Sequence, residues 1–134
     1  MSTSKVVYKG DLRTESTHLQ SGTTILTDAP TDNHGRGEAF SPTDMVANSL
    51  ATCMFSIMGI KAKAMDIRIE DSTAEVTKIM QTEPRKINEI IVVLKMKGVE
   101  DEKSKTILER AAMTCPVFLS LHPDIKKTVS FIWD

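Results

Sequence analysis

The feature that most constrains the fold is a long apolar stretch with helical spacing, which opens with "SPTDMVANSLATC", residues 41 to 53. Ser41 suits the N-cap position and Pro42 the first helical position, where the missing N–H of proline costs no hydrogen bond. Apolar residues then recur every three or four positions, and only Gly59 interrupts them. The pattern predicts one long, mostly buried helix from Pro42 to about Ala64.

The segments on both sides of this helix are typical of strands and one further helix. We expect an antiparallel meander before the helix, and a loop with several glycine and proline breaks between the two. The order of elements indicates an α+β fold in a single domain, 1–134. The expected ranges are strands near 6–8, 12–18 and 23–28, the loop 29–40, extended structure over 67–80, a strand over 87–98, a helix over 101–114 and a strand over 124–134.

Length and charge exclude some classes of protein. A chain of 134 residues can bury the core of one domain. It carries 17 Lys and Arg against 18 Asp and Glu, so a nucleic-acid partner is not expected. The opening "MSTSKVVYKG" is not a signal peptide, and no eighteen apolar residues run together, so we expect a cytoplasmic protein without a membrane partner. In a reducing compartment two cysteines are not expected to form a permanent bridge.

The two cysteines, Cys53 and Cys115, lie far apart in the sequence. A cysteine on a helix usually packs as a small apolar residue, and burial raises the pKa of a thiol and suppresses its reactivity. Cys115 precedes Pro116 and so suits an N-cap, where backbone N–H groups favour a thiolate. Alternatively, Cys115 ends the preceding helix and packs in the core. The residue pattern alone leaves both readings of Cys115 open.

No metal or cofactor site is expected. The chain has no CxxC motif, and its three histidines, His18, His34 and His122, are dispersed without the spacing of paired ligands.

Two quoted segments resemble one known family. "GRGEAFSPTDMVANSLATCM" and, about sixty residues later, "MTCPVFLSL" resemble the OsmC/Ohr family of osmotically induced and organic hydroperoxide resistance proteins. "HLQSGTTILTDAP" and the terminal "VSFIW" extend the likeness over almost the whole chain. The resemblance implies an OsmC-like fold with antiparallel sheets packed around a long central helix. It also implies an intertwined homodimer with active sites at the subunit interface.

The resemblance further implies a thiol-dependent peroxidase of the oxidative stress defence. Cys53 matches the thiol that attacks an organic hydroperoxide, and Cys115 matches the thiol that resolves the resulting sulfenic acid as a disulfide. A dithiol reductant, a lipoylated protein in some relatives, would restore both thiols. Arg13 lies near the position of the family's thiolate-stabilising arginine, and Arg36 is a second candidate.

One position departs from the pattern of the best-characterised hydroperoxidases. They carry a glutamate after the helix-opening proline, which holds the arginine, whereas this chain has Thr43. The nearest acid, Asp44, points about 100° further round the helix. The chain therefore resembles the OsmC-like branch more closely than Ohr proper. The departure leaves open whether the activity is weaker or the substrate differs.

Four apolar residues near the cysteines in sequence are candidates to bind a bulky organic hydroperoxide, although a methionine-rich stripe at helical spacing is more often plain core. Two other functions also stay open: a non-catalytic dimer that binds a small hydrophobic ligand, and a redox sensor. The four candidate binding residues are Met54, Phe55, Met113 and Phe118.

Overall fold

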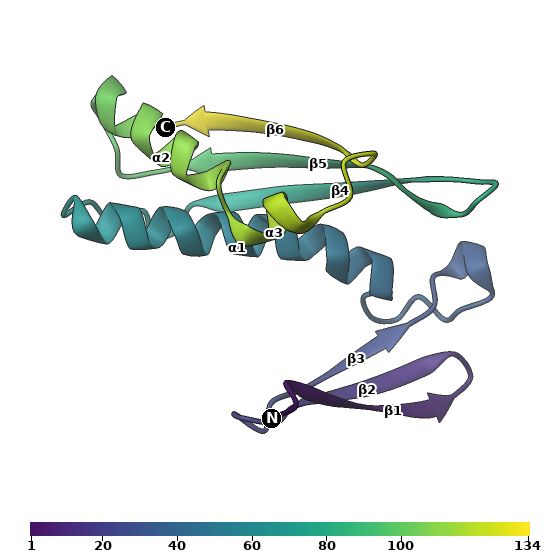
Figure 1. Cartoon of the computed structure of the whole chain (residues 1–134). Helices are drawn as coiled ribbons and strands as arrows, with labels where there is room; N and C mark the ends of the chain where they lie inside the picture. Colours follow the sequence, from purple (N-terminus) through teal and green to yellow (C-terminus); the bar gives the residue numbers. More distant parts are fainter. The chain divides into compact units, whose positions relative to one another are not determined.

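The computed structural model describes all residues from Met1 to Asp134, which group into two compact units, Met1–Met45 and Val46–Asp134. Figure 1 shows the strands and helices of each unit. In chain order they are β1 (Ser4–Gly10), β2 (Arg13–His18), β3 (Thr24–Asp28), the short 3-10 helix η1 (Thr31–Asn33), α1 (Pro42–Ala64), β4 (Thr73–Gln81), β5 (Lys86–Met96), α2 (Glu102–Ala112), α3 (Pro116–Ser120) and β6 (Lys126–Trp133).

The first unit is built on an antiparallel meander in the order β1-β2-β3, as the sequence predicts. Asp11 and Leu12 connect β1 to β2 with φ angles of 52° and 64°, the left-handed pair of a tight hairpin turn. In the register of β2 and β3, Arg13 lies opposite Asp28 and Thr14 opposite Thr27. Most apolar side chains of this unit are exposed: Val6, Val7, Tyr8, Leu12, Leu19, Ile25 and Leu26.

The start of α1 confirms the predicted cap. Ser41 Oγ accepts the Asp44 N–H at 3.0 Å, and Asp44 Oδ2 accepts the Ser41 N–H at 3.0 Å. This reciprocal pair satisfies two backbone donors that a helix start would otherwise leave unpaired. The predicted bounds of the helix, Pro42 to Ala64, match the structure.

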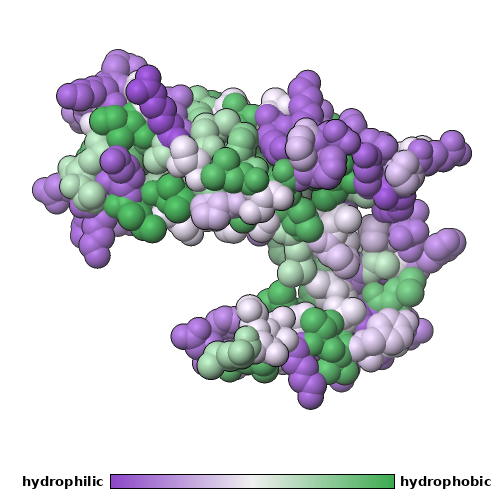
Figure 2. Space-filling view, in the orientation of Figure 1, coloured by the Kyte–Doolittle hydropathy of each residue, from purple (hydrophilic) through white to green (hydrophobic).

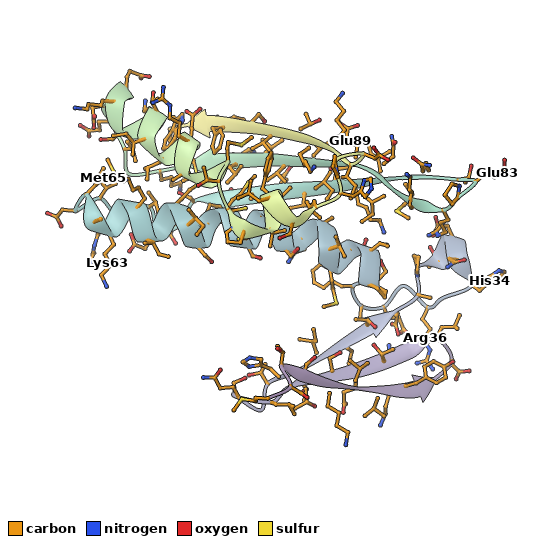
Figure 3. The ribbon with its side chains drawn as sticks, viewed as in Figure 1. His34, Arg36, Lys63, Met65, Glu83 and Glu89 are labelled. Atoms are coloured by element: carbon orange, nitrogen blue, oxygen red, sulfur yellow. The ribbon has the colours of Figure 1, made fainter.

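The second unit holds a three-stranded sheet in the order β4-β5-β6. β4 and β5 are antiparallel, but β6 pairs parallel to β5, which differs from the expected antiparallel sheets. The reason is the connection: α2 and α3 separate β5 from β6, and a helical crossover brings the chain back in the same direction. Figure 3 labels Glu83 at the tip of the β4–β5 hairpin.

The segment before β4 is not the strand that alternation predicts from residue 67. β4 begins only at Thr73, and Asp66 and Asp71 have φ angles of 56° and 70°. Positive φ angles interrupt an extended ladder, so the alternating isoleucines of this segment pack on the core from a loop.

The core of the second unit lies between α1, the sheet and α2. Leu50, Met54 and Met58 of α1 are fully buried, as are the inward side chains of β5. α1 is long and apolar enough to cross a membrane, but core helices commonly pass this test. Only 33% of its apolar window is buried within the chain. Figure 2 shows hydrophobic residues at the surface of this unit; the exposed ones include Val46, Ile60, Met113 and Leu119.

Candidate functional site

Cys115 is the N-cap residue of α3. Its backbone is extended, with φ −65° and ψ 145°, and Pro116 follows at the first helical position. The Phe118 N–H donates to Cys115 Sγ at 3.3 Å. The side chain is 0% exposed and belongs to the core cluster. Cys115 therefore caps α3 and packs in the core, but it does not end the preceding helix, whose last residue is Ala112.

Burial decides the protonation of Cys115. It raises the pKa of the thiol above its ordinary value of 9.0, and the Phe118 N–H offsets this only in part. The neighbouring Cys53 raises the pKa further, through a side-chain hydrogen bond and through charge. The expectation that the N-cap position would favour a thiolate is therefore wrong for Cys115, because α3 has only five residues and desolvation outweighs its N–H groups.

Cys53 lies beside Cys115. It is half-buried on α1, and both thiols are free. Its hydrogen-bonding and charge effects on the Cys115 thiol require the two side chains to be adjacent, although they are 62 positions apart in the sequence. A half-buried thiol next to a fully buried, protonated one can be oxidised first and then joined to its neighbour.

Three of the four candidate binding residues, Met54, Phe55 and Phe118, belong to or pack against the core cluster that also holds both cysteines. Met54 is 0% exposed and packs in the core. Phe55 lines a cavity of about 570 Å³ whose other lining residues fall between Gly59 and Ser72, and neither cysteine is among them. Phe118 contacts Cys115 through its N–H, and Met113, 36% exposed, follows the end of α2. Of the four, Phe118 contacts Cys115 directly, through its backbone N–H.

Arg13 forms an ion pair within the first unit. Its Nε donates to Asp28 Oδ1 at 2.8 Å and its Nη2 to Asp28 Oδ2 at 2.8 Å. Glu38 Oε1 lies 3.6 Å from Nη2. Because the two cysteines belong to the other unit, the action of Arg13 on Cys53 stays a prediction. Arg36, which Figure 3 labels, instead forms an exposed ion pair with Asp11, with Nη2 3.2 Å from Oδ2.

Asp28 was not among the residues singled out from the sequence. It is 1% exposed, and its Oδ2 also accepts the Glu38 N–H at 3.2 Å. The hydrogen bonds from Arg13 lower the pKa of this carboxyl below its ordinary value, so Asp28 is ionised near neutral pH. The signal that could have found it is the meander itself, since opposed polar residues on paired strands interact across the ladder.

The histidines make local contacts only. His18 Nδ1 bonds Ser21 Oγ at 2.6 Å, and His122 Nδ1 accepts the Asp124 N–H at 3.0 Å. His34 lies on the exposed loop before α1 with a φ of 67°. No group of three or more His, Cys, Asp or Glu side chains is arranged to hold a metal ion.

Comparison with known proteins shows the family of the chain. Residues 35–130 match the family model of OsmC-like proteins. A crystal structure from Psychrobacter arcticus, provisionally described as an osmotic stress induced and detoxification response protein, is 53% identical with a TM-score of 0.94. The match covers 98% of this chain and 96% of that one. A search of the curated proteins gives no significant match.

More distant structures share the fold. An OsmC-like protein of Mycoplasma pneumoniae is 20% identical with a TM-score of 0.79, covering 97% of this chain and 94% of that one. An organic hydroperoxide resistance protein of Legionella pneumophila is 18% identical with a TM-score of 0.72, covering 98% of each. The expected OsmC-like α+β fold is therefore confirmed, and the chain belongs to the OsmC family.

Proposed function

We propose that the protein is a cysteine-based peroxidase that reduces organic hydroperoxides in the oxidative stress defence of the cytoplasm. The observation that carries the proposal is the adjacency of a half-buried Cys53 and a buried, protonated Cys115. The printed name of the Legionella pneumophila relative, an organic hydroperoxide resistance protein, supports the substrate class.

The proposed reaction begins at Cys53. Its thiolate sulfur attacks the terminal oxygen of the hydroperoxide, so that an S–O bond forms and the O–O bond breaks. The alkoxide leaves and takes up a proton to become an alcohol, and Cys53 is left as a sulfenic acid.

Cys115 then completes the oxidation. Its sulfur attacks the Cys53 sulfur, the S–S bond forms, and the sulfenic hydroxyl leaves as water with the proton of the Cys115 thiol. A dithiol reductant, for which a lipoylated protein is our candidate, restores both thiols by exchange and becomes a disulfide itself. The protonated state of Cys115 before the reaction fits this order, because the second thiol should not compete for the hydroperoxide.

Two further parts of the proposal come from the family resemblance. Arg13 would favour the thiolate form of Cys53 by its positive charge. A homodimer would complete the site and cover apolar surface. The exposed apolar side chains on the three-stranded sheet of the first unit support a dimer, since such a sheet needs a packed face to be stable.

The test is peroxide consumption by purified variants. The wild-type protein with a dithiol reductant should consume cumene hydroperoxide, whereas Cys53→Ser should consume none above the reductant alone. Cys115→Ser should still form a sulfenic acid, trapped as a dimedone adduct, but no intramolecular disulfide. Ser56→Ala is the matched control, because its exposed hydroxyl on the same helix bonds only the Thr52 carbonyl.

Full consumption by Cys53→Ser would remove the proposal. A folded wild-type protein that consumes no hydroperoxide would instead favour a non-catalytic dimer that binds a small hydrophobic ligand.

A further inference from the structure

The two sulfurs of the cysteine pair differ in their access to solvent. Cys53 is half-buried on α1, whereas Cys115 is 0% exposed. Cys115 belongs to the core cluster, and its Sγ accepts the Phe118 N–H of α3 at 3.3 Å. Because the two side chains are adjacent, a disulfide between them would contain one reachable sulfur and one enclosed sulfur.

The direction of disulfide exchange depends on which sulfur the incoming thiol can reach. A thiolate attacks one sulfur of a disulfide, and the other sulfur departs with the electrons of the broken bond. Packing encloses Cys115, whereas Cys53 is partly open. We infer that the dithiol reductant attacks Cys53 and that Cys115 is the departing thiol. This inference rests on the proposed function, because it concerns the disulfide that the proposed reaction forms.

The acidity of the departing thiol opposes this direction, but its effect is smaller. Burial raises the pKa of Cys115, and a thiol of higher pKa departs more slowly. Because the Brønsted coefficient of thiol exchange is about 0.5, each unit of pKa changes the rate only about threefold. Attack on a buried sulfur instead requires a local opening, which roughly one molecule in a thousand or fewer adopts in a packed core. Access to the sulfur therefore outweighs its acidity.

The reduction proceeds by two exchange steps. The first thiolate of the dithiol forms an S–S bond with Cys53, the Cys53–Cys115 bond breaks, and Cys115 takes up a proton as it departs. The second thiolate of the dithiol then attacks the reductant's own sulfur in this mixed disulfide and releases Cys53 as a thiolate. The dithiol loses two electrons, which the protein disulfide gains. Burial favours the protonated Cys115, and this slows its return attack on the mixed disulfide.

The experiment determines which cysteine carries the incoming thiol. The protein is oxidised with diamide, mixed briefly with 2-mercaptoethanol, quenched in acid and labelled with N-ethylmaleimide after unfolding. Peptide mapping should find the mercaptoethanol on Cys53 and the maleimide on Cys115 at least about tenfold more often than the reverse. The same exchange in urea should give similar shares, because unfolding opens both sulfurs. Equal shares in the folded protein, or an adduct mostly on Cys115, would overturn the inference.

Two neighbouring residues of α3 test whether access is the cause. The Phe118 side chain packs against the core cluster that holds Cys115, whereas Leu119 is 71% exposed. Phe118→Ala should raise the share of adduct on Cys115 at least about threefold, because it loosens the packing. Leu119→Ala is the matched control and should leave the share unchanged. If Phe118→Ala does not fold, Phe118→Leu takes its place with the same expected direction, and an unchanged share would contradict access as the cause.

The test does not depend on peroxidase activity, because diamide oxidises the two thiols without a hydroperoxide. A protein that consumes no hydroperoxide but carries the adduct on Cys53 would defeat the proposed function and support the inferred direction of exchange. A protein that consumes hydroperoxide but carries the adduct on Cys115 would do the reverse. If diamide forms no disulfide within one chain, both fail.

Discussion

Asp28 and Cys115 are both ionisable and almost equally buried, at 1% and 0% exposure, yet their pKa values shift in opposite directions. The pKa of Asp28 falls because the Arg13 side chain donates two hydrogen bonds to its carboxylate. The pKa of Cys115 rises because burial disfavours its thiolate. Asp28 therefore stays charged in the first unit, whereas Cys115 stays neutral in the second.

The difference lies in the partners rather than in the depth of burial. Asp28 has a cation that meets it at two points and a backbone N–H besides. Cys115 has backbone N–H groups and, beside it, another thiol, which would add a second negative charge if both ionised. Burial without a cation gives a thiol that resists ionisation.

The largest expected effect comes from placing a carboxylate where no cation meets it. Cys115→Asp should lower the free energy of unfolding by about 3 kcal/mol at neutral pH, because the buried charge is unpaired. Urea unfolding measures it, and the loss should shrink at acidic pH as the carboxyl protonates. Cys115→Ser should change stability by no more than about 1 kcal/mol, since serine is a good N-cap. If Cys115→Asp were as stable as the wild-type protein, the buried site would tolerate an anion.

A second expected effect concerns the two thiols. In the folded protein, iodoacetamide should modify Cys53 at least about tenfold faster than Cys115, because only Cys53 is partly exposed and Cys115 is held as a thiol. Peptide mass mapping after timed labelling measures both rates. In urea the two rates should become similar. Equal rates in the folded protein would contradict the assignment of Cys115 as the protected thiol.

The opposite pKa shifts of Asp28 and Cys115 should cause two separate losses of stability, one at acidic and one at alkaline pH. Asp28, with its lowered pKa, stabilises the protein above the ordinary carboxyl value of 3.8, and this contribution disappears as the pH falls through its lower folded value. Cys115, with its raised pKa, contributes below 9.0, and this contribution disappears as the pH rises through its folded value. Thermal unfolding at a series of pH values measures both contributions. The loss of stability at acidic pH should be absent in Asp28→Asn, and the loss at alkaline pH should be absent in Cys115→Ala.

The smallest expected effect is at the start of α1, where the partners are again backbone N–H groups. Ser41→Ala removes the hydroxyl that accepts the Asp44 N–H and should cost about 1 kcal/mol of stability. Urea unfolding measures this change too, with Ser56→Ala as the exposed control on the same helix. A loss of stability as large as that of Cys115→Asp would contradict the expected order of the two effects.

The sequence predicts those features that depend on local pattern. The cap at Ser41, the bounds of α1, the meander and the N-cap position of Cys115 follow from residue types and spacing, and the structure contains all four. The strand expected from residue 67 fails because positive φ angles at Asp66 and Asp71 override the alternation. The parallel pairing of β6 also escapes a local pattern, because it depends on the path of the crossover.

The candidate site depends more on tertiary contacts. That Cys53 and Cys115 would meet could be expected only from the family resemblance, since nothing local joins residues 62 positions apart. The protonation of Cys115 could not be predicted, because the N-cap pattern shows the N–H donors but not the depth of burial. Asp28 was missed because its importance comes from the register of β2 and β3.

The most direct measurement is the chemical state of the two cysteines after one equivalent of cumene hydroperoxide. The folded protein should lose two hydrogen atoms by intact mass, and non-reducing peptide mapping should join Cys53 to Cys115 within one chain. Consumption of the hydroperoxide with both cysteines still open to alkylation after unfolding would contradict the account.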